Sequence, residues 1–176
     1  MRIIIYAAMI GCLATIFALG CSKPSEEVTV LKHFPLDTME GLITRSDVDI
    51  DKEISFDGNG SLRISTIQRT VVRLFEVRDI DIEDARLFYE AKVRTEDVDG
   101  LVYLKMWCHF TGKGEFFSQG LQSPLSGTNE WTTVQTAFSF RQGENPDIVN
   151  LQLVIDGGGT VWIDDIRLIK GPPRPQ

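Results

Sequence analysis

The sequence predicts an all-β protein built as one antiparallel β-sandwich. Many short segments alternate apolar and polar residues with the period of two that marks half-buried strands. Turn-forming residues separate these segments roughly every eight to twelve positions, a spacing typical of sandwich domains. Beyond the N-terminal segment, no long stretch has an apolar stripe with the 3.6-residue period of a helix. We therefore expect a single sandwich domain over residues 29–170.

Residues 1–20 predict a bacterial lipoprotein signal peptide. A positive charge at Arg2 precedes an almost unbroken apolar run, which suits a signal segment and is short for a membrane-spanning helix with flanks. The run ends in Ala-Leu-Gly-Cys, which resembles the lipobox at which Cys21 is diacylated and becomes the mature N-terminus. Alanine stands where leucine is usual in that pattern. Residues 21–28 would then be the lipidated cysteine and a polar tether.

This N-terminal segment predicts that the domain lies outside the cytoplasm. An uncleaved anchor and an ordinary secretory signal are the alternatives to lipidation, and both give the same side of the membrane. Ser22 after the cysteine resembles the signal that directs lipoproteins to the outer membrane. We therefore expect a lipid-anchored cell-envelope protein, at the outer membrane if the cell is Gram-negative.

Charge and cysteine content exclude two classes of protein. Removing residues 1–20, in which Arg2 is the one charged residue, takes the formal net charge from −7 to −8. A nucleic-acid partner is not expected, because no basic patch is available to neutralise phosphates. Only Cys108 lies within the domain, so no internal disulfide can form and the core alone must stabilise the fold.

The first half of the domain alternates acidic turns with β-rich runs. Asp57–Gly60 is a turn signal with two glycines, Ser46–Glu53 is acidic and loop-like, and Asp79–Asp84 is an acidic connection with room for one helical turn. The strands expected here are Val28–Leu31, Ser61–Ser65, Thr70–Val77 and Ala85–Thr95.

The second half continues the pattern, after a turn expected at Asp97–Gly100. Gly112–Gly127 is rich in glycine and polar residues and predicts a long loop, with Phe116 and Phe117 inside it. Residues 171–176 form a proline-rich tail. The strands expected here are Leu101–Phe110, Trp131–Phe140, Val149–Ile155 and a last strand that ends at Leu168.

The last strand contains a pair of carboxylates. Strict alternation from Trp162 places Asp164 on the same inward face as Ile166 and Leu168. An unpaired buried carboxylate is costly, so Asp164 would need hydrogen-bond donors, a cation or a metal ion.

Three segments of the chain resemble a known family. They are DGNGSLRI, NEWTTVQTAFSF and VNLQLVIDGGGTVWIDDIRL. Together they are similar to the galactose-binding-like jelly roll, and more narrowly to carbohydrate-binding modules of families four, nine and twenty-two, over roughly residues 34–170. The resemblance implies a jelly-roll sandwich on a bacterial lipoprotein.

The resemblance also implies a structural calcium ion that joins the first strand to the last. By position, its ligands would be Asp37 with Asp164 or Asp165, assisted by carbonyls near residues 57–61. Calcium needs six to eight oxygens, which carboxylates and turn carbonyls can supply. In the alternative interpretation, Asp164 accepts backbone N–H groups and Asp165 is simply exposed.

The outward face of the strand over Leu101–Phe110 is the predicted ligand site. Aromatic rings offer flat platforms to the C–H faces of sugars, while charged and amide groups bind hydroxyls. If the strands pair as in the family, side chains of neighbouring strands would share this surface. Packing of Trp107 under the following loop is the alternative. The residues of the predicted site are Tyr103, Lys105, Trp107, His109, Glu90, Arg94 and Gln152, with Asn150 and Asp156 beside them.

Catalysis is not predicted. The sequence lacks a nucleophile elbow, a P-loop and a dinucleotide-binding fingerprint. His33 and His109 have no metal-ligand spacing, and Cys108 falls on an apolar face, as a structural thiol does. Glu90 and Asp156 could pair for glycoside hydrolysis, but surface acids are common enough to form such pairs by chance.

The sequence therefore predicts a non-catalytic, membrane-anchored binding module for carbohydrate or a glycan-bearing surface. The alternative is a structural lipoprotein that docks another envelope protein, with a small hydrolase as a third possibility. The oligomeric state is left open.

Overall fold

A computed structural model describes residues 28–174 of the chain, and this part consists of strands and connections. It has no helix that is long and apolar enough to cross a membrane. The all-β class predicted from the periodicity is confirmed. The strands are β1 Thr29–Phe34, β2 Val48–Asp51, β3 Ser61–Thr66, β4 Thr70–Arg78, β5 Ala85–Phe110, β6 Gly114–Gln119, β7 Leu125–Phe140, β8 Ile148–Asp156 and β9 Gly159–Gly171.

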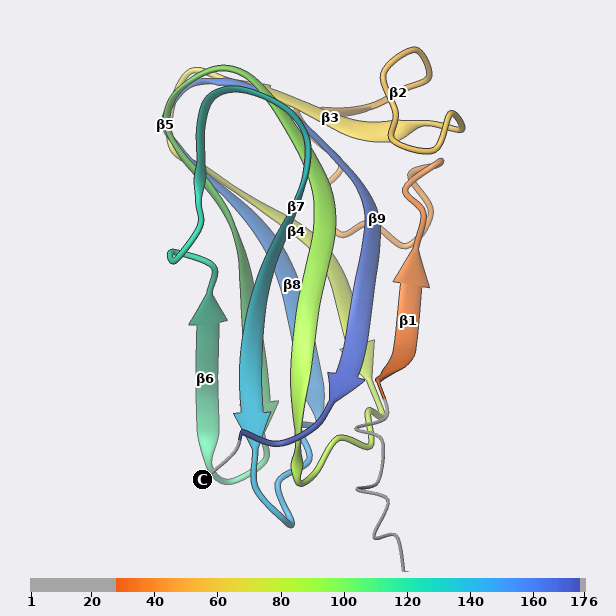
Figure 1. Cartoon of the computed structure of the whole chain (residues 1–176), viewed down its shortest axis with the longest axis vertical. Helices are drawn as coiled ribbons and strands as arrows, with labels where there is room; N and C mark the ends of the chain where they lie inside the picture. The colour runs from red at the N-terminus through yellow and green to blue at the C-terminus, as the bar shows by residue number, and fades with distance from the viewer. Residues whose placement is uncertain (1–27, 175–176) are drawn as a thin grey trace, which may run out of the picture.

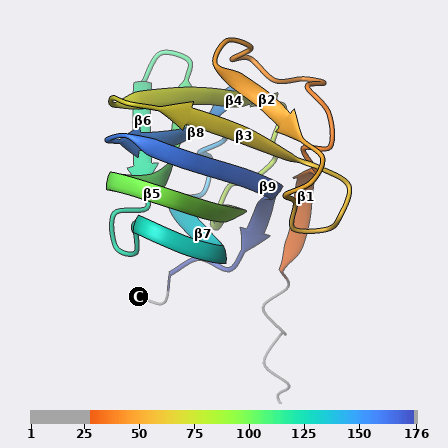
Figure 2. The same cartoon turned by 90° about the horizontal axis from the view of Figure 1, so that it is seen from above.

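Strand β5 belongs to both layers of the sandwich. Its first half pairs antiparallel with β7 and β9, so that Lys92 lies between Thr133 and Asp164. Its second half pairs with β6 and β8, so that Trp107 lies between Phe117 and Asn150. Figure 1 shows the two halves in different layers, joined by a bend at the top, and Figure 2 shows the same packing from above.

The two layers have defined strand orders. The front layer of Figure 1 runs β2-β3-β9-β5-β7, with β1 on the other part of β9. The back layer runs β6-β5-β8-β4. Every pairing is antiparallel, and the first strand lies beside the last, because Phe34 pairs with Ile166.

The predicted turn at Asp97–Gly100 is wrong, because the backbone bends there without leaving the sheet. Asp97 takes a left-handed φ of 51° inside β5. Gly100 packs so closely on β8 that a Cβ atom would lie 1.7 Å from the Asp156 carbonyl oxygen. Glycine is required at this position for that close approach.

The core lies between the two halves of β5. Leu87, Tyr89 and Val93 of the first half are fully buried, and so are Leu104 and Met106 of the second half. Their inward alternation is as the sequence predicted.

Cys108 belongs to the same core. Burial raises the pKa of its thiol to about 12, so the group is protonated and inert at neutral pH.

Three connections differ from the prediction. Val48–Asp51 in the acidic stretch forms the edge strand β2, since charged residues are tolerated on an exposed sheet edge. The predicted loop 112–127 contains β6 and the start of β7. Asp79–Asp84 forms no helical turn.

A bulge in β9 reverses the predicted faces of its first half. Register with β5 shifts between Asp164 and Arg167, and Asp165 takes a left-handed φ of 48°. Val161 and Ile163 therefore point into the core before the bulge, and Ile166 and Leu168 do so after it. Trp162 and Asp164 lie on the outer face of the front layer, so the predicted inward orientation of Asp164 is wrong.

Candidate carbohydrate-binding site

The predicted ligand residues of β5 lie on the outer surface of the back layer, which we call the aromatic face. Cross-strand pairs place Phe117 of β6, Trp107 of β5 and Asn150 of β8 in one row. The next row holds Gln119, Lys105 and Gln152, and the last of these pairs with Arg73 of β4. This surface is the outward half of the alternation that buries Leu104 and Met106.

An aromatic pair stands at its centre. The Trp107 and Phe117 ring centroids are 4.8 Å apart and the rings are tilted by 51°. Phe117 is 48% exposed and Trp107 is partly exposed. Strand β6 lies beside Trp107 and does not cover it. The alternative interpretation, in which Trp107 packs under the following loop, is therefore wrong.

Lys105 completes this centre. Its ammonium lies 4.5 Å from the Trp107 ring centroid and 4.6 Å from that of Phe117. A cation over two ring faces is attracted by their quadrupoles. The ammonium therefore stays next to the rings and can donate hydrogen bonds to a ligand that lies there.

Polar groups surround the aromatic pair. The Asn150 side-chain oxygen is buried and has no hydrogen-bond partner among the described residues. An acceptor in that state is costly unless a ligand or water satisfies it. His109 lies 3.7 Å from the Glu115 carboxylate at the end of the face, and Arg78 and Glu76 form an ion pair of 2.7 Å on β4. The surroundings thus offer donors and acceptors to hydroxyl groups.

Two predicted residues of this group do not belong to its surface. Glu90 and Arg94 lie on the first half of β5, paired with Arg167 and Trp162 of β9. That half belongs to the other layer and its outer side faces the opposite direction, so the predicted sharing of one surface is wrong. The guanidinium of Arg94 instead stacks on the Trp162 ring at 5.3 Å.

Tyr103 is only 8% exposed. It pairs with Val154 of β8, which is also buried, so this end of the face is covered. Tyr103 therefore supports the aromatic face from one end and presents little of its ring.

Sequence reasoning missed Phe117 as part of the face. It predicted a loop over Gly112–Gly127 because that stretch contains four glycines and many polar residues. The alternation of Glu115, Phe117 and Gln119 was the available signal for a strand, and these three residues pair with β5.

The carboxylate pair of β9 has protein partners on both residues. Asp164 is fully buried and accepts the Phe56 N–H at 2.8 Å and the Asp165 N–H at 2.7 Å. Burial is the main cause that raises the pKa of its carboxyl. Asp165 accepts from His33 at 2.7 Å and from Arg167 at 3.0 Å. The pair thus joins β9 to β1 and to the loop that covers Asp164.

At the predicted calcium site, one side-chain oxygen of Asp37 is buried without a hydrogen-bond partner among the described residues, which favours an ion there, whereas the neighbouring backbone carbonyls have a lysine partner. The Lys52 ammonium already donates to the backbone carbonyls of Asp37 at 2.7 Å and Asn59 at 2.8 Å. A divalent ion at these carbonyls would meet a like charge. Within residues 28–174, no three histidine, cysteine or acidic side chains gather as a metal cluster. Calcium stays a prediction, and in this structure Lys52 bonds to the Asp37 and Asn59 carbonyls near the predicted site.

Cys21, the predicted lipid site, lies outside the described residues. Lipidation and the envelope location therefore stay predictions.

Comparisons with known proteins place the fold. No protein-family model and no curated protein matches the chain. Among solved structures, the chain is similar to the CBM22-1 xylan-binding domain of Xyn10C from Paenibacillus barcinonensis, with 14% identity, a TM-score of 0.62, and coverage of 86% of this chain and 99% of that one.

Two further solved structures have the same fold. The C-terminal family 22 carbohydrate-binding module of Clostridium thermocellum Xyn10B matches with 10% identity and a TM-score of 0.53, covering 79% of this chain and 92% of the other. A family 16 carbohydrate-binding module matches with 14% identity and a TM-score of 0.51, covering 74% and 88%. The predicted resemblance is thus confirmed at the level of fold: the domain is a β-sandwich of the kind found in carbohydrate-binding modules.

Proposed function

We propose that this protein is a non-catalytic module that binds carbohydrate on its aromatic face while a lipid on Cys21 holds it at the cell envelope. The observation that carries the proposal is the partly exposed Trp107–Phe117 pair, with an unpartnered acceptor on Asn150 in the same row. Its mature chain projects from the membrane through residues 22–28.

The chemistry of the face suits a sugar chain. An exposed ring face packs against the apolar C–H side of a pyranose, and the release of water from both surfaces favours contact. The ammonium of Lys105 and the amides of Asn150 and Gln152 then meet the hydroxyls at the sugar's edge.

The similar solved structures support a carbohydrate as the ligand class. One is a xylan-binding domain, and another, which contains the CBM22-1 and GH10 modules of Clostridium thermocellum Xyn10B and of which this chain covers 29%, is complexed with xylohexaose. Sequence identity to both is low, so their individual ligands are not carried over.

A second function is favoured by an apolar edge next to the same face. Phe116, Phe117 and Leu121 are 49%, 48% and 46% exposed on β6 and the turn after it. Exposed apolar side chains along an edge strand are typical of protein contacts. An envelope protein that docks on β6 would use Phe116 and Leu121 as well as Phe117, whereas a sugar stacked on Trp107 needs only Phe117.

A glycan array with detergent-solubilised protein tests the proposal. We expect binding to a subset of neutral glycans that falls at least tenfold in Trp107→Ala and Phe117→Ala. Trp131→Ala is the matched control, because Trp131 is a partly exposed tryptophan on the other layer and packs against Phe56. Absence of glycan binding by the parent protein, or an equal loss in the control, contradicts the proposal.

A further inference from the structure

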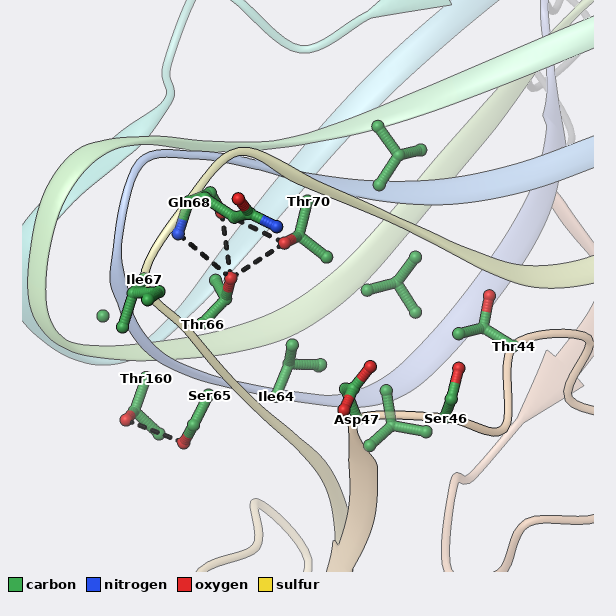
Figure 3. A pocket seen from close by; sticks show the side chains of 14 residues that line it. Thr44, Ser46, Asp47, Ile64, Ser65, Thr66, Ile67, Gln68, Thr70 and Thr160 are labelled. Carbon is green, nitrogen blue, oxygen red and sulfur yellow. Dashed lines mark hydrogen bonds between the residues drawn. The ribbon is translucent and has the colours of Figure 1, made fainter.

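A cleft of about 780 Å³ opens at the side of the sandwich, where the edges of the two layers separate. It lies between the β3–β4 connection on one side and the segment that leads into β2 on the other (Figure 3). None of the predicted ligand residues lines it.

The floor and rim of this cleft differ in chemistry. Val48, Ile64 and Val72 form an aliphatic floor that is almost fully buried. The rim consists mainly of hydroxyl, amide and carboxylate groups, together with the exposed aliphatic side chains of Ile67 and Val71, and the lining contains no lysine, arginine or aromatic residue. Its polar members are Thr44, Ser46, Asp47, Ser65, Thr66, Gln68, Thr70 and Thr160.

Part of the rim is already ordered by its own hydrogen bonds. The Thr66 hydroxyl lies 2.9 Å from both the Thr70 hydroxyl and the Gln68 carbonyl. The Ser65 and Thr160 hydroxyls lie 3.0 Å apart on the paired strands β3 and β9. These bonds, drawn in Figure 3, hold the walls in place before any ligand arrives.

Three other groups of the rim are free to bind. No side-chain hydrogen bond or ion pair joins Ser46, Asp47 or the Gln68 amide to another described residue. Asp47 takes a left-handed φ of 60°, which costs a residue with a Cβ conformational energy. The bend at Asp47 sets its carboxylate on the rim, across the cleft from Gln68, as Figure 3 shows.

This combination selects a ligand class. An anion is disfavoured, because Asp47 lies on the rim and no cation balances it. A purely apolar ligand would leave the hydroxyls unsatisfied. A divalent ion would find a single carboxylate. One uncharged sugar residue satisfies the rim, since each of its hydroxyls both donates and accepts, and its C–H groups cover the aliphatic floor.

The cleft adjoins the aromatic face. Val71 of β4 lines the cleft, is 40% exposed and pairs with Val154, which pairs with Tyr103. Two strand spacings, roughly 10 Å, therefore separate β5 from the mouth of the cleft. Trp107 lies four residues, roughly 13 Å, further along β5 than Tyr103, so a glycan of several sugar residues that runs obliquely from Trp107 past Gln152 towards β4 reaches the cleft.

We propose that this side cleft is a second carbohydrate subsite, which takes one uncharged residue that branches from a glycan lying on the aromatic face. The inference rests on the proposed function in one respect, because it needs a glycan on the aromatic face. The binding of a single sugar residue in the cleft does not depend on that glycan. Asp47 and Ser46 bond to hydroxyls on one side of that residue, and Gln68 bonds to a hydroxyl on its other side.

Backbone-amide NMR of the detergent-solubilised protein tests the subsite. The probes are free neutral monosaccharides, an unbranched β-1,4-xylooligosaccharide and the same chain with single arabinose branches. We expect the monosaccharides and the branched chain to shift amides of residues 44–48 and 65–70. Asp47→Asn and Gln68→Ala should each weaken binding of the branched chain roughly fivefold or more. Both variants should bind the unbranched chain as tightly as the parent protein does. Asp49→Asn, an exposed acid on β2 outside the lining, is the control.

The outcomes separate the two proposals. Shifts confined to the aromatic face with every probe overturn the subsite and leave the proposed function standing. Monosaccharide shifts in the cleft without any binding at Trp107 support the subsite and contradict the proposed function. If Asp47→Asn does not fold, the Gln68→Ala variant decides the same question, because Gln68 is exposed in a turn.

Discussion

Asp164 is where a single substitution should test the construction of β9. Its carboxylate is fully buried beneath the loop that contains Phe56, and its two oxygens accept backbone N–H groups of Phe56 and Asp165. We consider Asp164→Asn, which keeps the shape of the side chain. One oxygen becomes an amide nitrogen, so one backbone N–H faces a donor, and the bond to the remaining oxygen loses its charge.

The size of the effect follows from these contacts. A hydrogen bond to a charged acceptor contributes about 1.5–3 kcal/mol, and relief of the buried charge offsets part of its loss. We expect the free energy of unfolding at pH 7 to fall by about 1–3 kcal/mol, which lowers the melting temperature by roughly 3–10 °C for a domain of this size.

The pH dependence gives a second, independent readout. Burial, with a smaller contribution from Asp57 and Asp37, raises the pKa of Asp164 above its ordinary value near 3.8. Between these two pKa values the folded state holds more protons than the unfolded state, so this group's contribution to stability is greatest below the lower value and declines as the pH rises through the higher one. In Asp164→Asn that decline disappears.

Urea unfolding between pH 3 and pH 7 measures both effects. Glu53→Gln, an exposed acid in the same loop, serves as the control and should change neither quantity. An Asp164→Asn protein as stable as its parent at pH 7, with the same pH slope, would refute the assignment of these two hydrogen bonds.

Three further predictions concern the Lys52 ammonium that bonds to the Asp37 and Asn59 carbonyls, the bend in β5 and the lipid anchor. Lys52→Met should lower the melting temperature, because the Lys52 ammonium bonds to two backbone carbonyls. Excess EDTA should leave the melting temperature of the parent unchanged; a lower melting temperature of the parent in EDTA would support the predicted calcium ion. Gly100→Ala should abolish folding or cost more than about 3 kcal/mol by circular dichroism melting, since its Cβ would overlap the Asp156 carbonyl; a native melting curve would contradict the close packing. Cys21→Ser should remove the lipid mass and release the protein from membranes, as intact-mass spectrometry and fractionation can establish; an unaltered mature mass would contradict lipidation.

Period-two alternation predicted most strands because it reports which side chains are buried. The inward residues of both halves of β5 and of β8 were read correctly from the sequence. Local patterns could not reveal that β5 continues through Asp97–Gly100, since acidic residues and glycine signal a turn wherever they occur. Only the pairing of both halves with other strands shows that the chain bends and stays in the sheet.

The candidate site divides in the same way. The outward face of Lys105, Trp107 and His109 follows from alternation, and so does its aromatic character. Which strands lie beside it does not, because Phe117 and Asn150 reach Trp107 from opposite sides through pairings that are distant in sequence. Glu90 and Arg94 share the strand of Trp107 but not its layer, a consequence of the bend alone.

In the last strand, β9, some features follow from the local sequence and others only from the tertiary structure. By itself, the sequence determined that Trp162–Leu168 is a strand, that Asp164 needs hydrogen-bond donors and that the domain is a sandwich, because composition and period act locally. The tertiary structure decided the direction of Asp164, since a one-residue bulge at Asp165 turns the first half of β9 over. It also decided which groups meet the carboxylate pair, namely Phe56 and His33, because those contacts join segments that only the folded chain brings together.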